Sequence, residues 1–329
     1  MRSHFLPQKI TAACAVAGAT TLLGGSATAQ TFVAADYATN SIYVPSWSAS
    51  QNGGYGFGPW SFDGTTDDAN NPDAGSQQTM SSAAAIGTSW TLFNLSSSGG
   101  ISIAGRSFSE TNGMQPGQTF ETVIQNPTSY AFYRGFDILF ANSSTNLPAG
   151  DNTSALRMLV FNYYSTHWKA VDSAGTTVVP LSTADTGAAG LKFDLTLLST
   201  NTYSLTMTPL GNSAAPYTHT GTLSANLPIN YVTYRLWANQ STGSNDLADN
   251  LEISSMTIEG LPLNIQMAGT NTILSWLNIP GYYLESATSL GPPANWTSNT
   301  IPPTVVSGEN FVTNPVIGRQ QYFRLQLQQ

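Results

Sequence analysis

The sequence is poor in cysteine, in charged residues and in histidine. Its 329 residues include one cysteine, Cys14, and only 9% are Asp, Glu, Lys or Arg, against about 25% in an average soluble domain. A single thiol cannot form an intramolecular disulfide and offers no cysteine set for zinc. Because 10 Lys and Arg face 18 acidic residues, we expect no binding to nucleic acid, which requires clustered cations.

Catalytic motifs are also missing. His167 and His219 are the only histidines after residue 30, and no Gly-x-Ser-x-Gly elbow occurs. Glycoside hydrolysis needs two carboxylates across the scissile bond. The Glu-x-Asp-x-x-Glu string that laminarinase-type enzymes carry on one strand is absent. We therefore expect no enzymatic activity and no required cofactor, with a diverged polysaccharide-degrading enzyme as an alternative.

The first 29 residues have the pattern of a secretory signal peptide. Arg2 and Lys9 form a cationic start, residues 10–23 are apolar, and Ala27-Thr28-Ala29 is a small-x-small cleavage site. The apolar stretch is shorter than the ~20 residues that a membrane span needs. We expect cleavage after Ala29 and a mature chain that has no transmembrane segment, has no cysteine and is secreted, periplasmic or on the cell surface.

Alternation of apolar and polar residues dominates the rest of the chain. A period of two places apolar side chains on one face of a strand and Ser, Thr or charged residues on the other, which is typical of half-buried antiparallel strands. Two other runs, residues 136–140 and 156–161, are nearly continuous in apolar residues and suit central strands. The alternating runs are residues 101–108, 191–197, 203–208 and 251–258.

Helical patterns are scarce, and residues 77–86 are the best candidate for one. Many short strands without a βαβ rhythm predict an all-β fold, a β-sandwich or jelly roll. A boundary is expected at residues 259–262, between a large β domain (31–260) and a small one (262–329). The small domain has strand patterns of its own at residues 263–266, 272–277, 282–286, 310–313 and 321–327.

The carboxy-terminal region resembles a known module. The resemblance is carried by ILSW (273–276), YLESATSL (283–290), Asn295-Trp296, Asn314-Pro315 and QYFRL (321–325). These strings are similar to the small β domain at the end of many secreted verrucomicrobial and planctomycete proteins. The resemblance implies an immunoglobulin-like or fibronectin III-like β domain and implies no activity.

The front domain is similar to the concanavalin A-like or laminin-G-like sandwiches that accompany this module. Its matching segments are residues 56–60, 105–108, 203–209 and 249–253. Such sandwiches host lectins, hydrolases and adhesive domains alike, so the resemblance implies a fold and leaves the function open.

Two aromatic stretches are candidates for ligand binding. Sugars stack their C–H faces on aromatic rings, and amides bind their hydroxyls. Alternation along each stretch groups side chains of these kinds on one face, although core packing is the alternative for every ring. The candidate residues are Asn162, Tyr164, Thr166 and Trp168 in the first stretch, and Tyr231, Arg235 and Trp237 in the second.

Two acidic loops are candidates for structural calcium, which takes six to eight oxygen ligands from flexible loops. A solvated turn is the alternative reading of each. The candidate ligands are Asp63, Asp67, Asp68 and Asp73 in the first loop, and Asp246 and Asp249 in the second.

Three functions follow from these patterns. We favour an extracellular, non-catalytic protein that binds a polysaccharide or another cell-surface component through aromatic and amide side chains. The alternatives are a structural or adhesive surface protein and the diverged enzyme. An exposed Tyr164–Trp168 pair would favour the first, burial of every tryptophan the second, and two carboxylates about 5–10 Å apart in a cleft the third.

Overall fold

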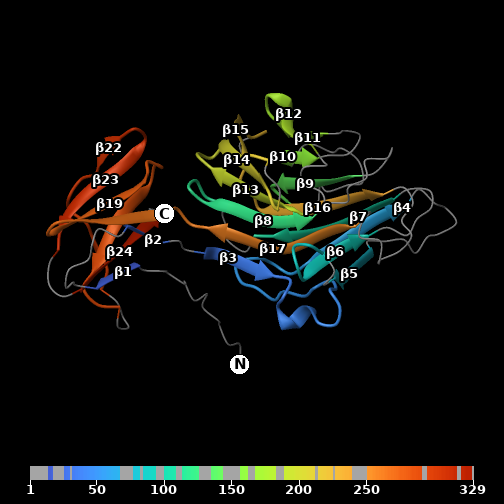
Figure 1. Cartoon of the computed structure of the whole chain (residues 1–329), viewed down its shortest axis with the longest axis horizontal. Coiled ribbons are helices and arrows are strands. Elements are labelled where there is room, and N and C mark those ends of the chain that lie inside the picture. The colour runs from blue at the N-terminus through green and yellow to red at the C-terminus, as the bar shows by residue number, and fades with distance from the viewer. Residues whose placement is uncertain are drawn as a thin grey trace. The chain divides into compact units, whose positions relative to one another are not determined.

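A computed structural model of the whole chain was analysed (Figure 1). The chain divides into two compact units, one formed by Ala34–Ile258 and the other by Glu259–Gln329 together with Met1–Val33. The structure describes residues 14–17, 26–29, 32–66, 77–81, 84–93, 100–108, 113–125, 135–143, 156–161, 167–182, 189–211, 214–224, 227–238, 250–290, 295–316 and 320–327.

One layer of the larger unit is a seven-stranded sheet with the order β12-β11-β10-β9-β16-β7-β4. The labels in Figure 1 follow one another in this order. Every neighbouring pair is antiparallel. The strands are β4 (Ser61–Thr66), β7 (Gly100–Ser107), β9 (Gly135–Ala141), β10 (Leu156–Phe161), β11 (His167–Asp172), β12 (Gly175–Ser182) and β16 (Tyr231–Ala238).

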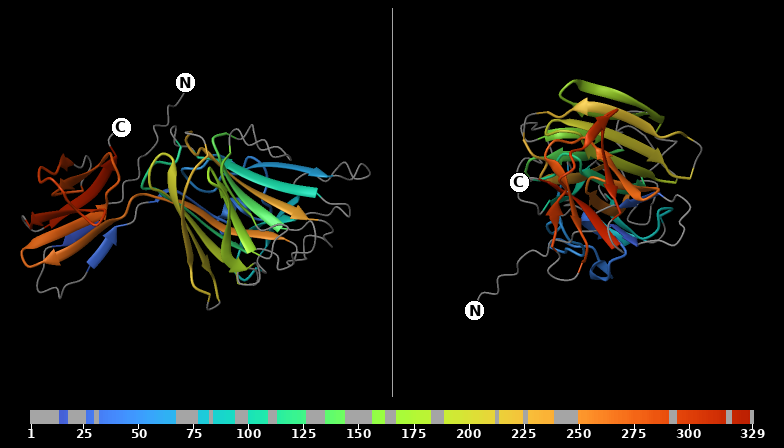
Figure 2. Two further views of the ribbon diagram at one scale, coloured as in Figure 1. Left: turned by 90° about the horizontal axis from the view of Figure 1, so that it is seen from above. Right: turned by 90° about the vertical axis from the view of Figure 1, so that its left-hand side faces the viewer.

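The other layer is an eight-stranded sheet with the order β15-β14-β13-β8-β17-β6-β5, in which β3 also pairs with β17. Figure 2 shows the same strands from two further directions. The strands are β3 (Phe32–Tyr37), β5 (Gln77–Ser81), β6 (Ser89–Phe93), β8 (Thr119–Gln125), β13 (Leu191–Leu197), β14 (Thr202–Pro209), β15 (Tyr217–Thr222) and β17 (Leu251–Glu259).

The two sheets of the larger unit pack face to face. The ring of Phe140 in β9 lies 5.2 Å from that of Phe120 in β8 and 5.9 Å from that of Phe193 in β13. The Tyr234 hydroxyl in β16 donates to Thr122 Oγ1 in β8 at 2.9 Å. Alternation therefore turns the neighbours of these residues along each strand toward the opposite face of the sheet.

The structure confirms the all-β prediction. The alternating runs predicted at residues 191–197 and 203–208 form β13 and β14, and both continuous runs form strands, β9 and β10. The helix expected within residues 77–86 is wrong, because Gln77–Ser81 forms β5 and pairs with β6. A segment this short gains more from the hydrogen bonds of a sheet than from an isolated helical turn, whose nucleation is unfavourable.

Ring contacts hold the first segment of the larger unit. The indole of Trp47 lies 4.8 Å from Trp60 and 6.1 Å from Trp90, and Trp60 lies 5.0 Å from Trp90. A single turn of 3₁₀ helix, η1 (Ser41–Tyr43), precedes Trp47 and places the Tyr43 ring 5.2 Å from Trp90. We call Trp47, Trp60 and Trp90 the tryptophan cluster, and all three are buried.

A buried charge network lies beside this cluster. The Arg106 guanidinium in β7 forms an ion pair with Asp36 in β3, and both side chains are fully buried. Arg106 also donates to Asn52 Oδ1 and, at 2.8 Å, to the Gly58 carbonyl. The Tyr43 hydroxyl donates to Asp36, and burial raises the pKa of Tyr43 to about 12. This network ties β3, η1 and the 52–58 segment to β7.

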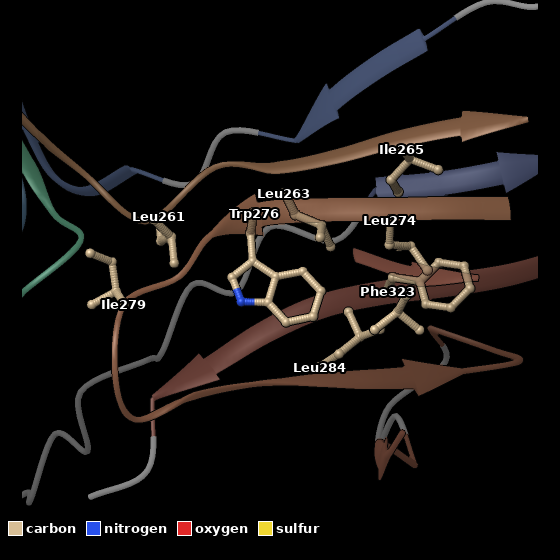
Figure 3. Close-up of a cluster of buried hydrophobic side chains, with 9 residues drawn as sticks. Leu261, Leu263, Ile265, Leu274, Trp276, Ile279, Leu284 and Phe323 are labelled. Atoms are coloured by element: carbon tan, nitrogen blue, oxygen red, sulfur yellow. The ribbon is translucent and has the colours of Figure 1, made fainter. Parts of the chain in front are cut away.

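The second unit contains two antiparallel sheets. Buried apolar side chains from both sheets point toward one another around Trp276 (Figure 3). One sheet has the order β1-β24-β20-β21 and the other β2-β18-β19-β23-β22. The strands are β1 (Cys14–Ala17), β2 (Ser26–Ala29), β18 (Leu263–Ala268), β19 (Asn271–Leu277), β20 (Tyr282–Ala287), β21 (Thr297–Ser298), β22 (Thr304–Val306), β23 (Glu309–Pro315) and β24 (Gln320–Leu327).

Two of these strands, β1 and β2, lie inside the expected signal peptide. Each is at the edge of its sheet, β1 beside β24 and β2 beside β18. The residues of the core shown in Figure 3 all come from positions 261–323. Removal of residues 1–29 would therefore open one edge of each of the two sheets.

Within the part of the chain that the structure describes, no helix has the length and apolar character needed to span a membrane.

Candidate functional site

The first predicted aromatic stretch does not present Trp168 to solvent. Trp168 in β11 is fully buried, and its ring lies 4.9 Å from that of Phe136. Phe136 belongs to the face of β9 that packs against the other sheet, so Trp168 is part of the inter-sheet core. The prediction that Trp168 stacks on a ligand is therefore wrong. Asn162, Tyr164 and Thr166 lie outside the described residues.

The second stretch is buried as well. Tyr231 and Arg235 lie on the face of β16 opposite Tyr234, and both are at least nine-tenths buried. Arg235 Nε and Nη2 donate to the two carboxylate oxygens of Asp137 in β9, each at 2.7 Å. The Tyr231 hydroxyl contacts the Ser61 hydroxyl. The prediction that Tyr231 and Arg235 offer exposed ligand contacts is wrong, and the side chain of Trp237 lies outside the described part.

The described residues contain no cluster of the predicted calcium ligands. Asp63 belongs to β4, but its side chain is outside the described part of the chain. No group of three or more His, Cys, Asp or Glu suited to a metal ion is found among the described residues. Calcium binding therefore stays a prediction. The other predicted ligands, Asp67, Asp68, Asp73, Asp246 and Asp249, lie outside the described residues.

One buried carboxylate, Glu252, is bound by hydroxyl groups. The hydroxyls of Ser89 and Thr91 in β6 both donate to Glu252 Oε2 in β17, and all three residues are buried. Burial raises the pKa of the Glu252 carboxyl above its usual value, while the two hydroxyls oppose this change. A neutral Glu252 carboxyl can still accept both hydrogen bonds through Oε2.

We expect Glu252→Gln to make the protein more stable at pH 8 and to leave its stability at pH 4 nearly unchanged. A carboxyl whose pKa is raised by folding contributes its stability at low pH and loses it as the pH rises through the folded-state pKa. Glutamine has no charge to bury, so the gain at pH 8 should be about 1 kcal/mol. Urea denaturation of both proteins at pH 4 and pH 8 measures the difference. Equal pH dependence of the two proteins would contradict this assignment.

A second acidic cluster lies on the outer face of the eight-stranded sheet. Asp194 in β13 is directly opposite Glu121 in β8, and Lys192 Nζ lies 3.2 Å from Asp194 and 2.7 Å from Glu121. Burial raises the pKa of Asp194 to about 6, although Lys192 opposes the change. Lys192 pairs with both carboxylates, and Thr119 and Thr196 form a hydroxyl pair beside them at 2.8 Å. This arrangement is better suited to ion pairing between partly hydrated side chains than to acid–base catalysis.

Two exposed tyrosines, Tyr37 and Tyr55, form a better binding surface. Ala35 and Tyr55 exchange two backbone hydrogen bonds of 3.0 Å, which makes them an antiparallel pair. Tyr37 is two residues beyond Ala35 and so is the diagonal neighbour of Tyr55 on the same face, at about 7–8 Å. Their exposed fractions are 45% and 41%, the two highest of the described aromatic side chains in the larger unit. We call this pair the tyrosine platform.

The segment that carries Tyr55 packs closely against the neighbouring backbone and side chains. A Cβ on Gly54 would overlap the carbonyl oxygen of Ala35, and one on Gly53 would come within 2.9 Å of Ile42, Tyr43 and Asn40. The Gly53 amide donates to the Tyr43 hydroxyl at 2.8 Å. Tyr43 itself belongs to the network of Asp36 and Arg106, so Tyr55 sits on a segment with little freedom to move.

The segment that leads to Tyr55 is fixed by an amide side chain. Gln51 Nε2 donates to the Ile42 carbonyl at 2.8 Å, and Gln51 Oε1 accepts from the Ser48 amide at 2.7 Å. The charges beneath, Asp36 and Arg106, are buried and neutralise each other. Exposed tyrosine rings above a buried and charge-balanced support are suited to an uncharged sugar ring.

Sequence reasoning missed the platform. Neither Tyr37 nor Tyr55 is among the binding residues that the sequence predicts. The available signal was a tyrosine between glycines, Gly54-Tyr55-Gly56. Glycine allows close approach of two backbones, as at Ala35, and such an approach can lift the adjacent side chain to the surface.

No protein-family model matches the chain, and no curated protein matches it. Among solved structures, a carbohydrate esterase of Shiga toxin-encoding bacteriophage phi24B is 11% identical, with a TM-score of 0.39, over 70% of this chain and 99% of that chain. The legume lectin-like domain of Entamoeba histolytica is 10% identical, with a TM-score of 0.39, over 60% and 88%.

A third similar structure is the GlcNAcα1-4Gal-releasing endo-β-galactosidase of Clostridium perfringens, 8% identical, with a TM-score of 0.37, over 82% of this chain and 92% of that chain. At these identities and TM-scores, the likeness transfers no ligand, activity or site residue to this chain.

Proposed function

We propose that the protein is an extracellular, non-catalytic glycan-binding protein that stacks an uncharged sugar ring on Tyr37 and Tyr55. The observation that carries the proposal is the exposure of these two rings on a support that is buried, hydrogen-bonded and free of net charge. Exposed aromatic rings on a rigid support bind with little loss of side-chain entropy.

A structural or adhesive role without small-ligand binding is the second candidate. It is favoured by the burial of Trp47, Trp60, Trp90 and Trp168, all the tryptophan side chains described in the larger unit. In the smaller unit the Trp296 ring is covered by the Arg324 guanidinium, 4.4 Å from the ring centre. A glycan-binding assay separates the two candidates.

We expect the wild-type chain to bind neutral polysaccharides on a glycan array, and Tyr37→Ala and Tyr55→Ala each to weaken binding about tenfold. Exposed aromatic contacts at the centre of a binding surface are commonly worth this much or more. The measurement is array binding followed by calorimetric titration with the strongest neutral oligosaccharide. Tyr37→Phe keeps the ring and should retain binding.

Phe32→Ala is the matched control for these variants. Phe32 is also an exposed aromatic residue of β3, but its odd spacing from Tyr37 places it on the opposite face of the strand. Its removal should leave the affinity unchanged. Binding of no glycan by the wild type would overturn the proposed function in favour of the structural role, and unchanged binding by both alanine variants would remove the site.

A further inference from the structure

Arg157 is a buried arginine that differs from the other arginines that the structure describes. Arg106 pairs with Asp36, Arg235 with Asp137 and Arg324 with Glu285. Arg157 is fully buried, and no ion pair links it to a carboxylate among the described residues. Its Nη2 donates to the Thr200 carbonyl at 3.3 Å, while Nε and Nη1 have no acceptor. Two guanidinium nitrogens are thus left without a partner.

The backbone at Arg157 turns its side chain away from the regular pattern of β10. The pairing of β10 with β9 is regular from Met158 to Phe161, but its register shifts between Leu156 and Met158. Arg157 is the extra residue of this bulge, and bulges re-aim side chains and are frequent beside functional sites. From the seven-stranded sheet the side chain reaches Thr200, in the connection between β13 and β14 of the other sheet.

Several connections meet at this end of the sandwich. The Ser224 amide donates to the Arg157 carbonyl at 3.0 Å, and the Leu223 amide donates to the Asn201 carbonyl at 2.7 Å. The segment after β15 is thus fixed beside both the start of β10 and the β13–β14 connection. The guanidinium lies where chain segments of both sheets converge. Binding sites are often formed by such connecting segments.

Asp172, a buried carboxylate of the neighbouring strand β11, already has hydrogen-bond partners. Asp172 Oδ2 accepts from the Tyr203 hydroxyl at 2.8 Å, and Oδ1 accepts from the Ala174 amide at 2.8 Å. Burial lowers the pKa of Arg157, and no anionic group among the described residues offsets this effect. A buried guanidinium without an anion is strongly disfavoured, and an external anion that binds there would relieve this penalty.

We propose that Arg157 anchors a binding site for an oxyanion, a carboxylate or sulfate group, at the end of the sandwich formed by β10 and the β13–β14 connection. The Nε–H group of the planar guanidinium donates to the anion, and a carboxylate or sulfate supplies the acceptor that the protein lacks there. The site is separate from the tyrosine platform and does not depend on it. The carboxylate of a uronic acid and a free inorganic anion share this chemistry.

The test is thermal unfolding of the whole chain with D-glucuronate, sulfate or phosphate, each compared with sodium chloride at equal ionic strength and with D-glucose. An anion at about one hundred times its Kd should raise the Tm of the wild type by about 5–10 °C. Arg157→Met keeps the apolar stem of the side chain and removes the charge. This variant should fold, match or exceed the Tm of the wild type without anion, and lose the anion-dependent rise.

Arg324→Met is the matched control, because it removes another arginine and should keep the rise. Sulfate also stabilises proteins generally, so a rise of equal size in the wild type and in Arg157→Met overturns the proposal. A rise with glucuronate alone identifies an acidic saccharide as the ligand, and a rise with all three anions identifies a general oxyanion site. No rise with any anion overturns the proposal.

If Arg157→Met does not fold, a second measurement on the wild type tests the proposal. The arginine Nε–H resonances of the wild-type chain can be followed by NMR during titration with glucuronate and sulfate. One buried Nε–H should shift in a saturable way as it gains an acceptor. Absence of any such shift would overturn the proposal without reference to the variant.

Discussion

Replacement of Arg106 by methionine is expected to lower the free energy of unfolding by about 3–5 kcal/mol. Methionine keeps much of the apolar volume over Phe57 and Trp60, whose ring centres lie 5.1 and 4.8 Å from the guanidinium. It leaves the Asp36 carboxylate buried without a cation. Removing one partner of a buried pair costs more than the pair itself contributes, since the remaining charge is uncompensated. Urea denaturation followed by far-UV circular dichroism measures the loss.

Two further variants identify the cause of this loss. In Arg106→Met/Asp36→Asn no charge is left in the network, so the double variant should be more stable than Arg106→Met alone. Arg324→Ala breaks a pair whose side chains are 19% and 11% exposed, so solvent screens it more than the Arg106–Asp36 pair and its loss should cost less than that of Arg106. If the double variant were as unstable as Arg106→Met, the lost packing of the side chain would be the cause, and the unpaired Asp36 would not.

The second large effect is expected for Gly54→Ala, which should destabilise the larger unit by about 3 kcal/mol and abolish binding at the tyrosine platform. The new methyl group would overlap the backbone oxygen of Ala35, which cannot rotate away as a side chain can. The two hydrogen bonds between Ala35 and Tyr55 would have to lengthen or break. Denaturation and glycan binding of the same variant give both results.

Gly87→Ala is the control for this substitution. No atom lies within 4 Å of the position that its Cβ would take, but its φ of +85° is unfavourable for alanine. We expect a loss of about 1 kcal/mol from this backbone strain and unchanged glycan binding. A Gly54→Ala variant as stable as Gly87→Ala would show that the Ala35–Tyr55 contact is not rigid.

The strands could be predicted because alternation is a local property. In β13 and β14 the apolar positions recur every second residue, and all of them are buried. Alternation determines which residues share a face but leaves open whether that face is covered. Tyr231 and Arg235 share a face as expected, yet that face is buried as completely as the face that carries Tyr234.

The sites depend on contacts between segments far apart in the sequence. Asp36 and Arg106 are separated by 70 positions, and Asp137 and Arg235 by 98. Neither pairing can be inferred from spacing, because it depends on which strands become neighbours. Tyr37 and Tyr55 are closer, but their meeting requires the contact of Gly54 with Ala35, which no periodicity reveals.

The packing of three indoles into one corner of the larger unit has an optical consequence. Trp47, Trp60 and Trp90 are buried with ring centres 4.8–6.1 Å apart, so their excited states couple, and their emission is that of an apolar medium. A red shift of that emission would mark the exposure of these indoles to water. Tryptophan fluorescence thus reports, without an added label, whether the first segment of the larger unit is attached.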